Sequence, residues 1–203
     1  LLLLFSTSPL PATWFDGGDL SALAHLENHG VVFRDPSGKP ADCIELMAAH
    51  GANCVRLRLF VEPTGKGFVV NSLDYTLALA KRTKAAGCAV MLDFHYSDTW
   101  ADPGKQYKPK AWEGLTFAEL VDTVETYTRE SVKAFATAGA MPDMVQVGNE
   151  INAGMIWPDG RLWVEGDDEG AAFDRLVRLL EAGFRGVADA TPADQPLPLR
   201  MVH

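Results

Sequence analysis

Asn149 and Glu150 are the residues best placed for chemistry, because they end the short apolar run Val145-Gln-Val-Gly-Asn-Glu-Ile151. A carboxyl group at the carboxyl end of a strand can donate a proton to a leaving oxygen, and an amide beside it can orient a sugar hydroxyl. An Asn-Glu pair at a strand end is more often a solvated turn. The catalytic hypothesis therefore depends on polar side chains at the ends of neighbouring strands.

Two arginines supply the first of these side chains. Arg56 and Arg58 lie two residues apart on a predicted strand, so their side chains share one face. Unpaired buried guanidinium groups are costly, which predicts facing carboxylates, and Asp93 and His95 have the same parity on the next strand. The alternative is a buried ion-pair network with a structural role only.

The scaffold for these residues is predicted from alternating patterns. Strands are expected at residues 53–60, 88–95, 143–147 and 197–202, preceded by a first strand within residues 14–19, with helical patterns between them. This alternation predicts an α/β fold with a parallel sheet of βαβ units. Connections at 96–115 and 151–170 are long for a compact domain, which indicates a substrate cleft after the third and fourth strands.

Helix boundaries are marked by capping residues. Ser72 is predicted to cap a helix that Gly87 ends, and Thr116 with Glu119 forms a capping-box pattern for a helix that ends at Gly139. The last helix is predicted to turn one apolar stripe to the core, formed by Phe173, Leu176, Val177, Leu180, Phe184 and Val187.

Composition excludes several classes of function. A net charge of -9 and a pI near 5.0 argue against a nucleic-acid partner, and no apolar run is long enough to span a membrane. Without a Gly-rich phosphate loop or an HExxH motif, we expect neither a cofactor nor a metal. Cys43, Cys54 and Cys88 lack CxxC spacing and are predicted to be buried thiols, with a Cys54 to Cys88 bridge as the alternative.

Long motifs carry a resemblance to a known family. Phe94-His-Tyr-Ser-Asp-Thr-Trp-Ala-Asp-Pro-Gly-Lys-Gln106 and Val145-Gln-Val-Gly-Asn-Glu-Ile-Asn-Ala-Gly-Met-Ile-Trp-Pro-Asp-Gly160 closely resemble glycoside hydrolase family 53, the endo-β-1,4-galactanases. Phe15-Asp-Gly-Gly-Asp-Leu-Ser21 and Val55-Arg-Leu-Arg58 fit the first two strands of that family. The resemblance implies a (β/α)8 TIM barrel of the retaining type that cleaves internal β-1,4 bonds of galactan or arabinogalactan.

The resemblance also implies roles for individual residues. Glu150 matches the acid/base at the end of strand four. The other matched residues form a set that binds substrate or supports the catalytic groups: Asp19 near a sugar subsite, Arg56 beside the nucleophile, His95 in the same polar shell, Asp98 within the strand-three motif, Trp100 and Trp157 as aromatic platforms, and Asn149 at the sugar 2-hydroxyl.

The sequence departs from the family pattern at the second carboxylate. The family's nucleophile is a Glu at the end of strand seven, and no residue here matches it, because 203 residues hold only about strands one to five. Residues 1–12 read as the remnant of a signal peptide, and 13–203 as the N-terminal part of a catalytic barrel. We therefore expect a secreted, monomeric full-length enzyme, of which this chain alone is inactive and prone to self-association.

Three alternatives stay open at this stage. The chain could be a non-catalytic half barrel that grips galactan through Trp100, Trp157 and Asn149, or a structural fragment whose strand edges pair with another chain. Within enzymes, the rival is another retaining hydrolase of the same clan, such as a β-mannanase or cellulase. The continuous match over residues 94–106 argues against that rival.

Overall fold

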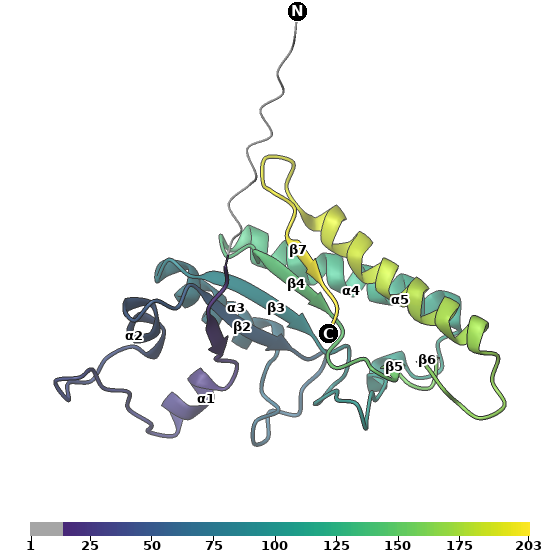
Figure 1. Ribbon diagram of the computed structural model, residues 1–203, viewed down its shortest axis with the longest axis horizontal. Helices are drawn as coiled ribbons and strands as arrows, with labels where there is room; N and C mark the ends of the chain where they lie inside the picture. The colour runs from purple at the N-terminus through teal and green to yellow at the C-terminus, as the bar shows by residue number, and fades with distance from the viewer. Residues whose placement is uncertain (1–13) are drawn as a thin grey trace, which may run out of the picture.

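A parallel sheet organises the chain. The computed structural model describes residues 14–203, so the predicted signal-peptide remnant at 1–12 lies outside the described residues. The sheet order is β1-β2-β3-β4-β7, with every neighbouring pair parallel (Figure 1): β1 (Gly17–Asp19), β2 (Cys54–Leu59), β3 (Ala89–Phe94), β4 (Met144–Val147) and β7 (Leu199–Met201). Sequential parallel strands in this order are what the first five strands of a (β/α)8 barrel require.

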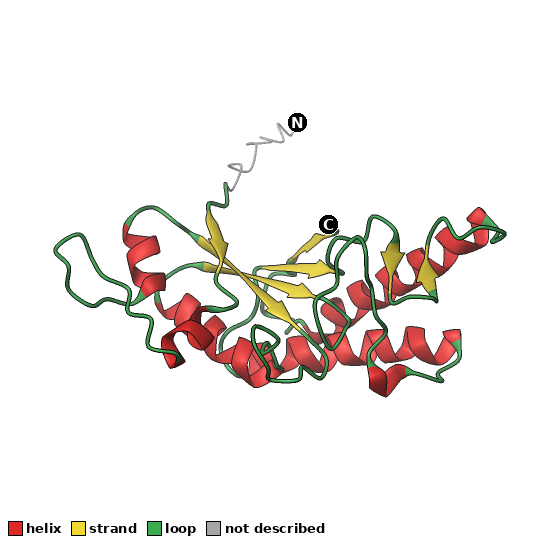
Figure 2. Cartoon of the chain, turned by 90° about the horizontal axis from the view of Figure 1, so that it is seen from below, coloured by secondary structure: helices red, strands yellow, loops and turns green. Residues whose placement is uncertain are grey.

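Helices connect the strands and cover one side of the sheet. They are α1 (Leu23–Asn28), α2 (Cys43–Ala49), α3 (Leu73–Ala85), the 3-10 turn η1 (Lys110–Trp112), α4 (Phe117–Thr137) and α5 (Glu169–Ala190). A small antiparallel pair, β5 (Gly154–Met155) and β6 (Gly160–Arg161), lies in the connection after β4. Figure 2 shows the long helices on one side of the sheet, with its other face uncovered among the described residues.

Strand alternation divides apolar from polar side chains. The helix-facing residues of the central strands are fully buried in the hydrophobic core: Val55, Leu57, Leu59, Val90, Leu92, Phe94, Val145 and Val147. The opposite parity holds Arg56 and Arg58 on β2, Asp93 on β3 and Gln146 on β4. The sheet therefore packs one face against the helices and carries the polar residues on the other.

The predicted boundaries are largely confirmed, and two strands are shorter than expected. Ser72 accepts a hydrogen bond from the Tyr75 backbone N–H, and Thr116 forms the predicted capping box with Glu119. β1 pairs only over Gly17–Asp19, and β7 only over Leu199–Met201. Pro198 precedes β7 and has no N–H to donate to the sheet, which explains its late start.

The predicted stripe of α5 is wrong in part. Phe173 and Val177 are 46% and 47% exposed, whereas the buried face contains Gly183 and Gly186. A Cβ at Gly186 would lie 2.5 Å from the Glu125 carbonyl oxygen on α4, so this helix pair packs closer than a side chain would allow. The buried face therefore combines small residues with Leu176, Leu179 and Val187, and leaves Phe173 and Val177 outside it.

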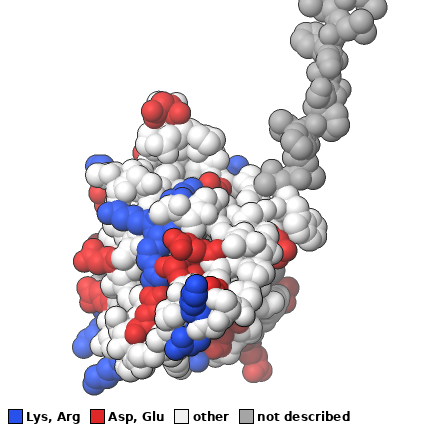
Figure 3. Space-filling view, turned by 90° about the vertical axis from the view of Figure 1, so that its left-hand side faces the viewer, with Lys and Arg blue, Asp and Glu red and all other residues white. Residues whose placement is uncertain are grey.

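The three cysteines are buried free thiols, as predicted, and the alternative Cys54 to Cys88 bridge is not formed. Burial raises the pKa of all three thiols. On the face drawn in Figure 3, basic and acidic side chains lie intermingled rather than in separate patches. None of the helices between residues 14 and 203 is long and apolar enough to cross a membrane.

Candidate active site

The predicted polar residues meet at the carboxyl ends of β1 to β4, with Arg56 at the centre. Its Nη1 lies 2.6 Å from Oδ2 of Asp19, and its Nη2 lies 2.7 Å from both Oδ2 of Asp93 and Oδ1 of Asn149. Arg56 therefore joins strands β1 and β3 to the Asn149-Glu150 pair. The carboxylates that the sequence predicts opposite Arg56 are present.

Asp93 is the fully buried carboxylate of this cluster. Its side chain is fully buried, and its carboxylate meets Arg56, Nε2 of Gln146 at 2.6 Å and Nε2 of His95 at 3.0 Å. A carboxylate in such a position is stable only because the facing groups are donors.

The tautomer of His95 follows from its neighbours. Nδ1 accepts a hydrogen bond of 3.0 Å from the Ala101 backbone N–H, so Nδ1 must keep its lone pair and the ring hydrogen lies on Nε2. Nε2 faces Asp93. His95 thus joins the start of the loop after β3 to the buried carboxylate.

Asn149 is held at both ends of its amide. Oδ1 accepts from Arg56 at 2.7 Å and faces Nε2 of Gln146 at 3.3 Å, while Nδ2 donates to the Ala101 carbonyl at 2.8 Å. An amide nitrogen carries two hydrogens, so Nδ2 keeps one to donate to a ligand. This is the capacity that a contact with a sugar hydroxyl needs.

Glu150 differs from its neighbours because its carboxylate has no hydrogen-bond or ion-pair partner among residues 14–203. The residue is half-buried, and its backbone adopts a left-handed conformation with φ 48°. That conformation costs a non-glycine residue about 1 to 2 kcal/mol, so the surrounding contacts must hold it. Gly148 has φ 83° and cannot accept a Cβ, which would lie 2.7 Å from Cγ2 of Ile151.

Asp19 lies at the open side of the cluster, with its side chain 29% exposed. Burial raises the pKa of this carboxyl, but the Arg58 guanidinium and hydrogen bonds from Ser21 outweigh burial, so the net pKa lies below its ordinary value. Arg58 stands 3.0 Å from Oδ1 of Asp19. Asp19 is therefore held as a carboxylate beside the two arginines.

Two of the residues predicted for substrate binding, Asp98 and Trp100, lie in the loop after β3. Asp98 accepts hydrogen bonds from the backbone N–H groups of Glu62 and Lys110, so both of its oxygens fix loop conformation. Trp100 is 36% exposed, and one face of its indole is covered by the Arg58 guanidinium at 3.9 Å. Trp100 therefore belongs to the cluster around Arg56, and part of its own aromatic surface is exposed.

Trp157 stands further along the loop after β4. It lines a hollow of about 420 Å³ together with Tyr107, Lys108, Glu113, Gly114 and Pro158. Its Nε1 donates to the Ala153 carbonyl at 2.9 Å, and Arg161 covers the ring at 4.2 Å. An isolated bridge between Tyr107 and Trp157 joins the loop after β3 to the loop after β4 at this hollow.

Two buried glutamines belong to the site and were not predicted. Gln146 carried the same signal as Arg56, a polar residue of inward parity on an apolar strand, and it contacts both Asp93 and Asn149. Gln106 lies in an irregular loop with no periodic pattern, and its side chain binds the carbonyl groups of Asn149 and Glu150. Parity could have found Gln146, whereas only the folded loop reveals Gln106.

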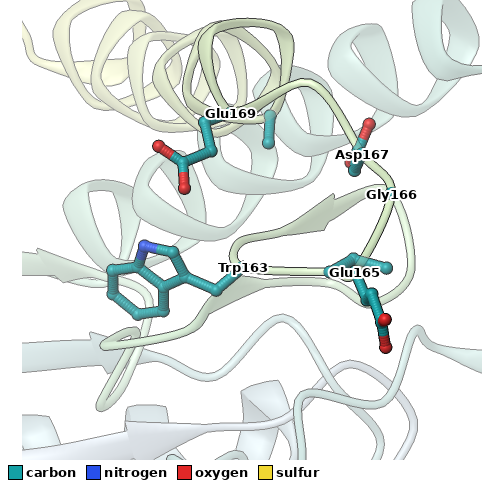
Figure 4. Close-up of a pocket in the computed structure, with 7 residues that line it drawn as sticks. Trp163, Glu165, Gly166, Asp167 and Glu169 are labelled. Carbon is teal, nitrogen blue, oxygen red and sulfur yellow. The ribbon is translucent and has the colours of Figure 1, made fainter.

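A separate hollow of about 340 Å³ lies between β6 and α5 (Figure 4) and is lined by Trp163, Val164, Glu165, Gly166, Asp167, Glu169 and Ala172. In that view Glu169 points from the helix toward the Trp163 ring, while Glu165 points away from it. None of the residues of the Arg56 cluster lines this hollow. We therefore treat it as a surface feature outside the candidate site.

Comparison with known proteins gives consistent matches. Residues 15–202 match the model of glycosyl hydrolase family 53. An uncharacterized protein of Niallia circulans, named for the bgaB 5′ region, is 43% identical over 84% of this chain and 46% of its own length. An arabinogalactan endo-β-1,4-galactanase of Thermothelomyces thermophilus is 36% identical over 95% of this chain and 54% of its own length.

A solved structure extends the likeness to three dimensions. It comes from a study of two fungal β-1,4-galactanases and matches with a TM-score of 0.83 at 36% identity, over 95% of this chain and 54% of that chain. With the parallel sheet described above, this likeness confirms the predicted fold as the N-terminal part of a (β/α)8 barrel. The chain spans about half the length of the curated relatives it matches.

Proposed function

The chain belongs to glycosyl hydrolase family 53, and from this membership we propose that the protein containing it is an endo-acting, retaining hydrolase of β-1,4-galactosidic bonds in galactan or arabinogalactan. The observation that carries the proposal is the Glu150 carboxylate just after β4, which has no partner among residues 14–203 and lies next to an Asn149 amide fixed by Arg56. A structural ion-pair network would need Arg56 and Asp93, but it would not need a carboxylate without a partner.

The proposed chemistry begins with Glu150 as the acid. Its carboxyl group protonates the oxygen that leaves between two galactose units, and its carboxylate then activates the water that releases the product. Retention needs a second carboxylate about 5 to 5.5 Å away as nucleophile. The family pattern places that Glu at the end of the seventh barrel strand, beyond the five barrel strands of this chain, so the activity is proposed for the complete protein.

Substrate binding is assigned to groups around Glu150. The free hydrogen on Nδ2 of Asn149 is aimed at a sugar 2-hydroxyl, and Arg56, with His95 and Asp19 around it, supports the reacting centre. Indole faces can cover the apolar C–H face of galactose, which suits Trp100 as a platform away from the cleavage point and Trp157 with Tyr107 in their hollow. Asp98 supports the loops that carry these residues.

Replacing Trp100 by Ala is expected to weaken binding more than catalysis, because an aromatic platform contributes mainly uniform binding. We expect KM on galactan to rise about tenfold, the change that loss of roughly 1.4 kcal/mol of binding produces, with kcat nearly unchanged. Steady-state kinetics on galactan measure both constants. The matched control is Trp163→Ala, because Trp163 is more exposed, at 62%, and lines the separate hollow (Figure 4). A fall in kcat at constant KM would instead place Trp100 at the reacting sugar or in the structural core.

We also propose how the chain is divided and where the enzyme acts. We assign residues 13–203 to the N-terminal part of the catalytic barrel, and the apolar residues 1–12 to a signal peptide of a secreted, monomeric protein. A polysaccharide too large to enter a cell must be cut outside it. The acidic net charge is compatible with a neutral polysaccharide substrate.

The function is tested with the complete protein on purified polysaccharides. Release of reducing ends from β-1,4-galactan, with none from β-mannan or cellulose, is the expected result. Hydrolysis of mannan or cellulose in place of galactan would move the protein to another activity. Binding of galactan without reducing-end release would support the non-catalytic alternative, and the absence of both would overturn the proposal.

A further inference from the structure

Gln106 is a buried polar residue that the proposed mechanism does not use. Its side chain is 1% exposed, and its Nε2 lies 2.8 Å from the Asn149 carbonyl oxygen, 3.2 Å from that of Glu150 and 3.2 Å from that of Asp102. An amide nitrogen has two hydrogens to give, so the three carbonyl groups share them. The donor end of Gln106 is therefore committed to the backbone around the proposed acid.

The same residue holds the connection after β4 at a second point, in the turn between β5 and β6. The backbone carbonyl of Gln106 accepts a hydrogen bond of 2.7 Å from the Trp157 N–H, next to the bridge between Tyr107 and Trp157. The loop thus has two anchors on Gln106, one through its side chain at residues 149 and 150 and one through its backbone at residue 157. A loop segment held at two points keeps a defined shape between them.

The conformation of Glu150 explains why a side-chain donor is needed there. The chain has positive φ at Gly148 and again at Glu150, and the carbonyl groups of Asn149 and Glu150 both face Gln106. A carbonyl group turned into the protein in this way needs a donor, and no strand supplies one because β4 has ended at Val147. On the other side of the turn, the Ile151 N–H donates to the His203 carbonyl at 2.8 Å.

We propose that Gln106 is a positioning residue for catalysis: its amide fixes the left-handed turn at Glu150, so that the acid/base carboxyl is presented at one place above the strand ends. This inference rests on the proposed function of Glu150. Gln106 acts through the peptide backbone of Glu150 and does not itself reach the substrate. Its loss should therefore impair proton donation more than sugar binding.

Two substitutions separate the donor function from the volume of the side chain. Gln106→Glu keeps the shape but sets an acceptor-only group against three carbonyl oxygens when ionised. Gln106→Met keeps the length and removes the donors without adding charge. Gln195→Glu is the matched control, because Gln195 is exposed in the connection before β7.

The experiment compares two substrates in the complete protein. On galactan, kcat of both Gln106 variants is expected to fall roughly 10- to 100-fold with KM little changed, as a misplacement of about 1 Å produces. The first step on an aryl galacto-oligosaccharide with a good leaving group, measured as the initial burst of released aryl group or as kcat/KM, needs little acid assistance and should lose much less. Rates are expressed per folded molecule from thermal unfolding, so a variant that only folds less gives unchanged kcat and overturns the inference.

A crystal structure of Gln106→Met gives a readout independent of activity. We expect the φ of Glu150 to leave the positive region, and retention of the present conformation would overturn the role of Gln106. The two hypotheses fail differently. A protein without substitutions that releases no reducing ends from galactan contradicts the proposed function, whereas full galactan turnover by both variants contradicts only the role of Gln106.

Discussion

Replacing Glu150 by Gln is expected to lower kcat on unactivated galactan by roughly 10²- to 10⁴-fold, the range that general acid catalysis contributes. The substitution keeps the size of the side chain and removes the transferable proton. Because the Glu150 carboxylate has no partner among residues 14–203, its replacement should leave stability unchanged. The measurement is the initial rate of reducing-end release by the complete protein, with thermal unfolding of the same samples.

A substrate with a good leaving group distinguishes loss of the acid from general damage to the active site. An aryl galacto-oligosaccharide with a good leaving group should still form the glycosyl intermediate in Glu150→Gln, because its bond breaks without much protonation. Glu181→Gln on α5 is the matched control, since that side chain is 63% exposed and on the helix layer. Polymer hydrolysis at the original rate in Glu150→Gln would show that another group is the acid.

Strand parity predicted the cluster of Arg56, Arg58, Asp93 and His95 in the candidate site, because parity follows from the geometry of the backbone. Side chains at i and i+2 share a face in any strand, so Arg56 and Arg58 had to face one side, with Asp93 beside them on the next strand. The parallel sheet then brings the ends of successive strands together. The meeting of Arg56, Asp93 and Asn149 could therefore be predicted without coordinates.

The remaining features depend on contacts between segments without periodicity. Gln106 reaches Asn149 and Glu150 because a loop folds back across the end of β4, and no local pattern encodes that path. On α5, Gly183 and Gly186 form the closest contacts, and a scale of hydrophobicity gives glycine little weight. The rule that large apolar residues face the core therefore placed Phe173 and Val177 on the buried face of α5, whereas both are exposed.

Asp93→Asn is expected to lower the free energy of unfolding by about 3 kcal/mol, the low end of the range for removing one partner of a buried ion pair. Asp93 is fully buried, and its loss of charge leaves Arg56 without its innermost counter-ion. We expect the low end of this range because the Arg56 side chain is 24% exposed and keeps its ion pair with Asp19. Urea unfolding of the complete protein, followed by tryptophan fluorescence, measures the change as a shift of midpoint at constant slope.

The control for this prediction is Asp143→Asn. Asp143 pairs with Lys84 at 2.6 Å, but its side chain is 40% exposed, so we expect a loss below about 1 kcal/mol. Its hydrogen bond from the Val90 N–H can be kept by the asparagine oxygen. Equal losses in the two variants would mean that the Asp93 network is as weakly coupled to folding as a surface pair.

A double replacement then decides between a structural and a catalytic role for the same network. Apolar side chains in place of a buried ion pair often restore stability, so Arg56→Met with Asp93→Leu should be more stable than Asp93→Asn alone. Catalysis should not return with stability, because Asn149 loses the 2.7 Å hydrogen bond from Arg56 that fixes its amide. If the double variant regains both stability and galactan turnover, the arginine and the buried carboxylate serve folding only, and the catalytic site consists of Glu150 and its loop contacts.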